Sequence, residues 1–119
     1  MRRGKYGAVK TGGHASRKEH RRALQLRLLE QQGEIFNLRE QVPYELVPTQ
    51  YKDIVKQLKT KSKVEQRVAE RSVSYIADFV YEDADGNTIV EDTKGFRTPD
   101  YIIKRKLMLS VYGIRINEI

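Results

Sequence analysis

Residues 75–95, YIADFVYEDADGNTIVEDTKG, constrain the fold more than any other stretch of the sequence. Two β-rich runs flank residues 83–87, whose Asp-Gly pair tolerates the positive φ of a tight turn. We therefore predict a β-hairpin. Side chains two apart on a strand share a face, so Asp92 and Lys94 point the same way. Pairing of the two strands could then place Asp78 beside Asp92.

Asp78 is the least expected residue of the first strand. Residues 71–82 carry apolar side chains at both alternating positions, as in a strand that is covered on both faces. A carboxylate in such a strand is costly unless it is paired or bound to a metal. Two carboxylates and an ammonium on one face suit Mg²⁺, with the lysine near a phosphate or a water. A salt bridge from Asp78 to Lys94 is the alternative.

Helix and strand patterns surround this hairpin. Residues 16–32 predict a helix with a leucine-rich face, an S-x-x-E capping box and Gly33 as its end. Residues 35–41 predict a strand, which a bend at Pro43 separates from an extended piece at 44–47. Thr98-Pro99-Asp100 begins a helix that runs to about Tyr112 and ends at Gly113. Residues 114–119 alternate apolar and polar, as a closing strand would.

Residues 48–71 form an insertion with five lysines and loosely spaced apolar residues. That spacing favours one or two short helical turns within a solvated, partly flexible loop. Contact with DNA backbone or with a second subunit is the alternative. The lysines are Lys52, Lys56, Lys59, Lys61 and Lys63.

The net charge of +7 lies entirely within residues 1–22, where eight Lys or Arg face Glu19 alone. Such a concentration predicts binding to a polyanion such as DNA, and a solvated tail that aids solubility is the alternative. We divide the 119 residues into a flexible basic N-terminal segment, 1–13, and a single domain, 14–119. The basic residues expected to bind nucleic acid are Arg2, Arg3, Lys5, Lys10, Arg17, Lys18, Arg21 and Arg22.

Composition excludes several classes of protein. The chain has no cysteine, so it can form neither a disulfide framework nor a thiolate metal site. Its two histidines are too few for a multi-histidine zinc site. It also lacks an apolar run of the roughly 20 residues that span a bilayer. We therefore expect a cytoplasmic protein with no membrane partner.

Four short blocks carry a resemblance to a known superfamily. They are SRKE at 16–19, YIADF at 75–79, VEDTKG at 90–95 and KRKL at 104–107. In this order they resemble the PD-(D/E)XK, or restriction-endonuclease-like, nucleases. They are most similar to a small phage-encoded family long catalogued only as a domain of unknown function. The similarity covers most of the chain from about Gly12, and Ala77 stands where the superfamily has its proline.

The resemblance implies a fold and a metal site. The fold is an α/β, restriction-endonuclease-like core, a mixed central sheet flanked by helices in the order α-β-β-β-α-β. Asp78 and Asp92 would bind Mg²⁺, for which Mn²⁺ could substitute. Glu19 would hold a second metal or a metal-bound water, although its capping-box role is an alternative. Lys94 would orient the attacking water and steady the phosphate. Glu91 should point to the other face, unless a β-bulge exchanges it with Asp92.

These implications predict a metal-dependent endodeoxyribonuclease of a phage, acting in its bacterial host. We expect selectivity for branched DNA, as in Holliday-junction resolvases that act in replication, recombination or packaging. A homodimer would present two sites to two strands. Lys104 and Lys106 would face DNA. The alternatives are a non-catalytic, basic nucleic-acid-binding accessory protein and an RNA-processing nuclease.

Overall fold

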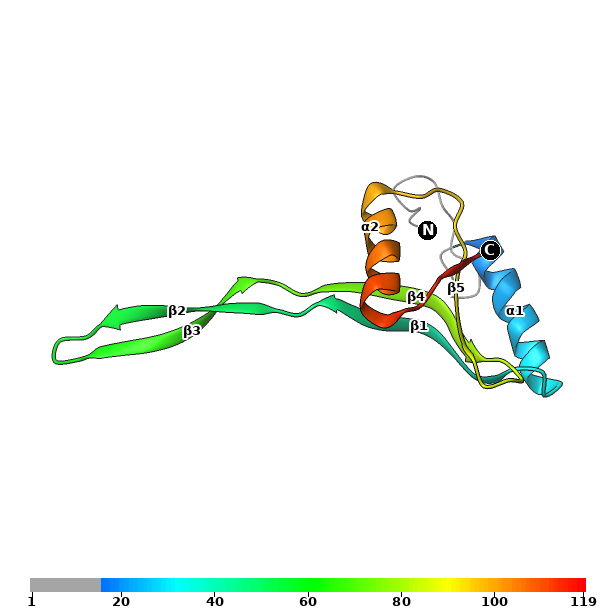
Figure 1. Ribbon diagram of the computed structural model, residues 1–119, viewed down its shortest axis with the longest axis horizontal. Coiled ribbons are helices and arrows are strands. Elements are labelled where there is room, and N and C mark those ends of the chain that lie inside the picture. Colours follow the sequence, from blue (N-terminus) through cyan, green and yellow to red (C-terminus); the bar gives the residue numbers. More distant parts are fainter. Residues whose placement is uncertain (1–15) are drawn as a thin grey trace, which may run out of the picture.

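The computed structural model describes residues 16–119, which form two parts (Figure 1). The body is a four-stranded sheet with two helices, and the arm is a two-stranded β-ribbon, residues 50–70, that projects from it. The elements in order are α1 (Arg17–Gln31), β1 (Phe36–Val47), β2 (Gln50–Gln57), β3 (Ser62–Glu70), β4 (Val73–Glu82), β5 (Thr88–Asp92), α2 (Pro99–Leu107), a π-helical turn η1 (Met108–Tyr112) and β6 (Asn117–Glu118).

The sheet of the body is mixed, which confirms the predicted α/β class. Its strand order is β1-β4-β5-β6, and β6 runs parallel to β5 while the other neighbours are antiparallel. β1 is an edge strand, where a proline can be accommodated without breaking a ladder on both sides. The predicted bend at Pro43 is wrong for this reason: β1 is continuous, and Pro43 stands opposite Ile76.

The helix ends follow the predicted capping residues. The Ser16 side chain accepts a hydrogen bond from the Glu19 N–H at 3.1 Å, and Thr98 accepts one from the Tyr101 N–H at 3.3 Å. Gly33 and Gly113 have φ values of 74° and 68°, the left-handed conformation that ends a helix at low cost for glycine. No helix among residues 16–119 is long and apolar enough to cross a membrane.

Two hydrophobic clusters hold the body together. The α1 core contains Ala23 and Leu26 of the helix and Phe79 and Tyr81 of β4. The α2 core contains Val80 and Val90, which alternate with the residues of the α1 core along their strands. The two helices therefore cover opposite faces of the β4–β5 pair. The other members of the α2 core are Leu46, Tyr75, Ala77, Tyr101, Met108 and Ile116, and Ile35 completes the α1 core.

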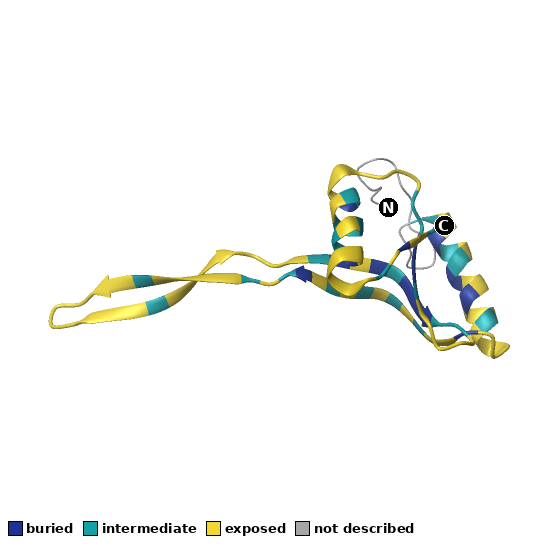
Figure 2. Cartoon of the chain, viewed as in Figure 1, coloured by how far each residue is buried: buried dark blue, intermediate teal, exposed yellow. Residues whose placement is uncertain are grey.

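The predicted helical turns of the insertion are wrong, because residues 50–70 form the β-ribbon of the arm. The ribbon continues the β1–β4 pair: Val47 stands opposite Val73, and the pairing resumes at Gln50 and Glu70 after Pro48. β-branched residues on both strands favour this extended conformation. No residue of the arm is buried, in contrast to the body (Figure 2).

Candidate metal centre

The register of the sheet places Asp78 between Gln41 and Asp92. On one side, the pairs Glu40 with Phe79 and Val42 with Ala77 bracket Gln41 and leave it opposite Asp78. On the other side, Phe79 pairs with Glu91, so the next step along both strands brings Asp78 beside Asp92. The two aspartates that the sequence predicts to be neighbours thus lie on adjacent strands, at the middle of β4 and the end of β5.

This point is also where the two hydrophobic cores meet. Within β4, Phe79 and Tyr81 pack in the α1 core, whereas Tyr75 and Ala77 pack in the α2 core. β1 changes in the same way, because Leu38 packs against the α1 core and residues 42, 44 and 46 belong with the α2 core. Gln41 has a φ of 53°, a conformation that costs a non-glycine residue free energy. Polar side chains at this boundary fall between the two apolar clusters.

Asp78 is held by neutral donors. Its Oδ2 accepts hydrogen bonds from the backbone N–H and the hydroxyl of Thr93, both at 2.9 Å, and the Gln41 amide lies 3.5 Å from its Oδ1. Burial acts to raise the pKa of Asp78, but its hydrogen bonds with the Glu19 carboxyl group and with Thr93 outweigh burial and keep that pKa below its ordinary value. Asp78 is therefore oriented as a carboxylate, with Thr93 as a partner that the sequence did not predict.

Asp92 is almost fully buried, with 2% of its surface exposed. The Tyr75 hydroxyl donates to its Oδ2 at 2.5 Å, and Lys94 Nζ lies 3.3 Å from its Oδ1. Burial, together with the negative charge of Asp78, raises the pKa of Asp92 to about 6. The alternative pairing of Lys94 with Asp78 is not what the structure shows, since the ion pair of Lys94 is with Asp92. The two carboxylates repel each other, and a cation between them would relieve that repulsion.

Glu19 reaches the same place from the first turn of α1. It is 4% exposed, and the Gln41 side chain donates to its Oε1 at 3.4 Å. The Gln41 amide thus lies between the carboxylates of Glu19 and Asp78. The capping alternative describes the Glu19 backbone N–H, which bonds to Ser16, while the carboxyl group lies beside Asp78. The Ser16 cap is confirmed, and the metal-site role of the Glu19 carboxyl group stays a prediction.

Lys94 lies at the open edge of this cluster. About a quarter of its side chain is exposed, and its Nζ lies 4.3 Å from the centroid of the Tyr101 ring, a cation–π contact that restrains it. Beside it is a pocket of about 260 Å³, whose lining includes Ser74, Tyr101 and Lys104. A phosphate that entered this pocket would meet Lys94 and Lys104, with the Asp100 carboxylate also in the lining.

The side chains present fit a magnesium ion held by Asp78 and Asp92. No group of three or more His, Cys, Asp or Glu among residues 16–119 is arranged to enclose a metal ion by itself. Mg²⁺ does not need such a cage, because it keeps several waters and commonly binds one or two carboxylates. Burial and the charge of Asp78 raise the pKa of Asp92 even though the Lys94 ammonium lies beside it. Glu19 would then contact the ion through a bound water.

Glu91 points to the opposite face of the sheet, as predicted. Two nitrogens of Arg22 bond to its two carboxylate oxygens at 2.7 and 2.6 Å, and the Tyr81 hydroxyl donates to it as well. Arg22 was predicted to bind nucleic acid, whereas in the structure its guanidinium is engaged by this buried carboxylate. Arg22 and Glu91 are 69 residues apart in the sequence, so no local pattern indicated this pairing.

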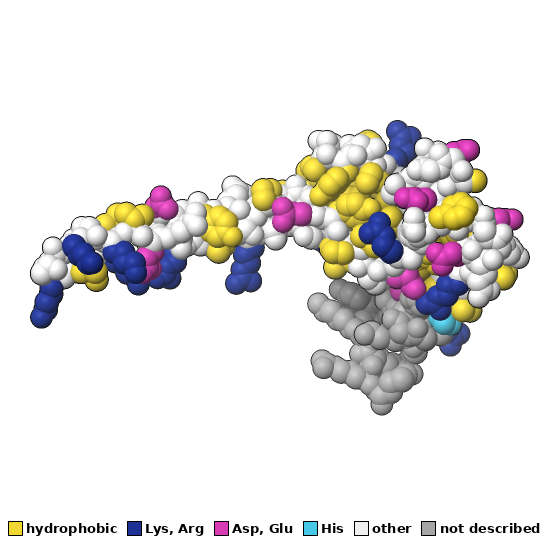
Figure 3. All heavy atoms as spheres, turned by 90° about the horizontal axis from the view of Figure 1, so that it is seen from below, with side chains coloured by type: hydrophobic (Ala, Val, Ile, Leu, Met, Phe, Trp, Pro, Cys, Tyr) yellow, Lys and Arg dark blue, Asp and Glu magenta, His cyan; other side chains and the backbone are white. Residues whose placement is uncertain are grey.

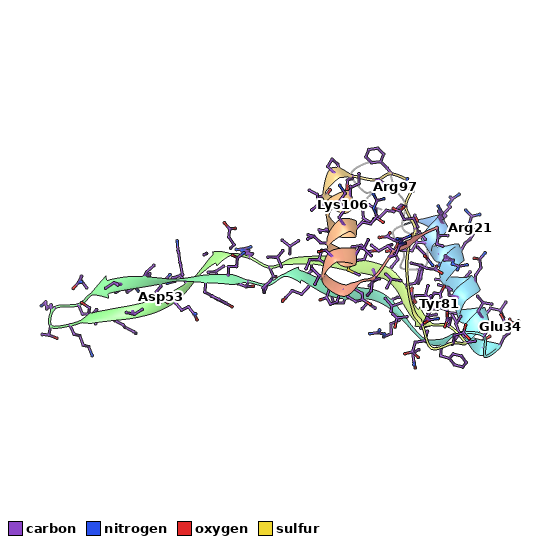
Figure 4. The ribbon with its side chains drawn as sticks, viewed as in Figure 1. Arg21, Glu34, Asp53, Tyr81, Arg97 and Lys106 are labelled. Carbon is purple, nitrogen blue, oxygen red and sulfur yellow. The ribbon has the colours of Figure 1, made fainter. Side chains whose placement is uncertain are left out.

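The other predicted nucleic-acid contacts are spread over the molecule. Arg17, Lys18 and Arg21 are exposed on α1, while Lys106 is exposed on α2 and Lys104 lines the pocket beside Lys94. Figure 4 shows Arg21 and Lys106 on different helices, so α1 and α2 each contribute to a basic surface. Arg2, Arg3, Lys5 and Lys10 lie outside the described residues.

A second ion-pair group, which sequence reasoning missed, fixes the C-terminal strand. Glu118 of β6 accepts hydrogen bonds from Arg97 at 3.0 Å and from the Tyr101 hydroxyl at 2.8 Å, and Arg105 lies 3.4 Å away. These hydrogen bonds lower the pKa of Glu118 to about 2. Glu118 is far in the sequence from its partners, so no local pattern predicts these contacts.

Comparison with known proteins yields a family but no characterised relative. No curated protein and no solved structure matches the chain. A family model described as "Protein of unknown function (DUF1064)" matches residues 3–116, which include all the residues of the candidate metal centre. The chain therefore belongs to the DUF1064 family.

Proposed function

We propose that this protein is a metal-dependent endonuclease that hydrolyses DNA phosphodiesters, related to the PD-(D/E)XK superfamily. The observation that carries the proposal is the meeting of three carboxylates and one ammonium at the boundary of the two cores. They come from separate elements: Glu19 from α1, Asp78 from β4, and Asp92 from the end of β5, with Lys94 just beyond that strand.

Each side chain has a chemical role in this proposal. Bound at Asp78 and Asp92, a divalent ion would supply charge stabilisation at the phosphoryl oxygens and a water of lowered pKa. Lys94, at the edge of the pocket, would contact the phosphate and orient the attacking water. Thr93 fixes the orientation of Asp78 by two hydrogen bonds, and Tyr75 does the same for Asp92. Glu19 would accept a proton or a hydrogen bond from water.

A purely structural role fits these acids less well than it fits Glu91. A structural buried carboxylate is normally matched by a cation with full hydrogen bonding, and Glu91 has such a partner in Arg22. Asp78 has neutral donors, and Asp92 has one lysine that is also in contact with Tyr101. Burial and the charge of Asp78 raise the pKa of Asp92, and carboxylates perturbed in this way are typical of functional sites.

The substrate proposal extends this chemistry to branched DNA. A homodimer would present two such sites to two strands, which suits a Holliday junction or a related branch. The main alternative is a non-catalytic nucleic-acid-binding accessory protein, for which the exposed lysine and arginine side chains of α1 and α2 would suffice. An RNA-processing nuclease is a further alternative, because the described side chains of the site do not distinguish RNA, which has a 2′-hydroxyl, from DNA.

The test is cleavage of nicked, flapped, four-way and linear DNA with Mg²⁺ or Mn²⁺. We expect Asp92→Asn and Lys94→Ala to lower the rate by roughly 100-fold or more, since each removes a group acting at the reacting phosphate. Glu91→Gln is the matched control, because it changes the neighbouring residue on the opposite face and keeps a hydrogen-bonding partner for Arg22. Unimpaired cleavage by Asp92→Asn would rule out this site, and binding without metal-dependent turnover would favour the accessory protein.

A further inference from the structure

The two faces of the arm differ in chemistry. Directly paired residues of an antiparallel ribbon share a face, and here Lys52 pairs with Arg67, Ile54 with Glu65, and Lys56 with Lys63. We call this the basic face. On the other face, Tyr51 pairs with Val68 and Val55 with Val64. We call that the apolar face, and Asp53 with Gln66 also belongs to it. Figure 3 shows Lys and Arg side chains projecting mainly along one side of the arm.

The basic face concentrates like charges that the fold itself does not require. Lys52 with Arg67, and Lys56 with Lys63, are directly opposed cation pairs, an arrangement that destabilises a ribbon. Glu65 stands between the two pairs, 3.2 Å from Lys56 and 3.0 Å from Arg67. One carboxylate cannot neutralise four cations. The face therefore keeps an excess of positive charge on a ribbon that has no buried residue to stabilise it.

We propose that the basic face of the arm binds the phosphate backbone of double-stranded DNA. A polyanion would relieve the repulsion between the opposed cations and would supply the stabilisation that burial does not. The face carries no aromatic side chain, since Tyr51 lies on the apolar face, so it offers no platform on which unstacked bases could stack. Contacts to a duplex backbone need no such platform. The inference rests on the proposed function for DNA as the ligand and for the position of the reacting phosphate.

The position of the arm predicts how long a DNA duplex must be to contact it. β1 and β2 form one nearly continuous extended path from Gln41 to Lys56 (Figure 1). At about 3.3 Å per residue, these positions are roughly 50 Å apart along the chain. Duplex DNA rises about 3.4 Å per base pair, so Lys56 would contact DNA about 15 base pairs from the reacting phosphate, and Lys52, which is nearer to Gln41, about 11 base pairs from it. A substrate with shorter duplex segments would not reach it.

The experiment measures binding without cleavage. Fluorescence anisotropy in EDTA compares the full chain with the variant Lys52→Gln, Lys56→Gln, Lys63→Gln, Arg67→Gln on labelled duplexes of 40 and 8 base pairs. For the long duplex, we expect at least 10-fold weaker binding at 100 mM salt, and a shallower dependence of log K on log salt by about 2 to 4. Binding to the short duplex should change less than twofold.

A matched variant on the apolar face, Val55→Thr with Val64→Thr, keeps β propensity and should leave both affinities unchanged. Circular dichroism checks that each variant keeps its strands. Equal losses on the two duplexes, a loss on 40-base-pair RNA as large as on DNA, or no loss at all would each overturn the proposal. Because the assay contains no metal, a protein that binds through the arm but never cleaves would refute the nuclease and leave this inference standing.

Discussion

The body and the arm both contain arginine–glutamate ion pairs, but the pair in the body is more buried than the pair on the arm (Figure 2). Arg22 and Glu91 form an ion pair in the body, where the carboxylate is 1% exposed. Arg67 and Glu65 form one on the arm, where the arginine is 52% exposed. A buried pair cannot be broken without stranding a charge, whereas water readily replaces either partner of an exposed one. The lysine and arginine side chains of the arm thus remain available to a ligand.

The largest contrast should come from the two arginines. Among residues 16–119, Arg22→Ala leaves the buried Glu91 carboxylate with the Tyr81 hydroxyl as its remaining hydrogen-bonding partner, and we expect a loss of about 3 kcal/mol in the free energy of unfolding. Arg67→Ala should cost under about 0.5 kcal/mol. Urea unfolding followed by circular dichroism measures both. Similar values for the two variants would show that burial does not separate the two parts.

The two aspartates provide the second contrast, with the opposite sign. Without metal, Asp92→Asn should stabilise the protein at pH 7 by about 1 to 2 kcal/mol, because it removes a carboxylate that burial and Asp78 disfavour. Asp53→Asn, at an exposed position on the arm, should change stability by less than about 0.5 kcal/mol. Thermal or urea unfolding in EDTA measures these differences.

The pH dependence tests the cause of that gain. The folded pKa of Asp92, about 6, lies above the ordinary value of 3.8, so the folded state keeps a proton that the unfolded chain has lost. Stability therefore falls as pH rises from about 4 to about 6, and the advantage of Asp92→Asn should vanish below about pH 4. A gain that persisted at low pH would have another origin. Mg²⁺ should stabilise the unmodified chain and not the variant.

Local patterns predicted much of the body. Ser16, Thr98 and the Asp-Gly turn at residues 83–87 marked element ends because capping and turn chemistry are set by a few neighbouring residues. The separation of Asp92 from Glu91 followed from the twofold period of a strand, and the Arg22 and Tyr81 contacts of Glu91 confirm it. Whether the predicted site residues are catalytic stays a prediction.

The arm and the long-range pairs were beyond the same reasoning. Alternation is hidden in residues 50–70, because the basic face includes Ile54 and the apolar face includes Asp53, so neither face is uniform in the sequence. That mixture produced the wrong prediction of helical turns. Arg22 with Glu91 and Tyr75 with Asp92 join distant segments, and the sequence alone does not give such pairings. The strained φ of Gln41 likewise depends on where the two cores meet.

Two glutamates, each bonded to more than one cation, give the third contrast. Glu118→Gln in the body should cost about 1 kcal/mol at pH 7, since its carboxylate is held by Arg97 and Tyr101. Its folded pKa, about 2, lies below the ordinary 4.5, so this contribution is complete above about pH 4.5 and is lost as pH falls toward 2. Glu65→Gln on the arm should have an effect below about 0.5 kcal/mol at pH 7. Unfolding curves at pH 3 and pH 7 decide between them.

The smallest expected effect concerns the backbone of β1. Among the described residues, only Asn37 and Gln41 combine a side chain with a positive φ, and none of the arm does. Gln41→Gly should relieve the strain and raise stability by about 0.5 to 1 kcal/mol, while asparagine tolerates this conformation, so Asn37→Gly should gain less. If Gln41 is strained because its amide must lie between Glu19 and Asp78, the stabilised variant should also cleave DNA more slowly, by about 10-fold. A Gln41→Gly protein that gained stability and kept its full cleavage rate would show that cleavage does not require the strained backbone at this position.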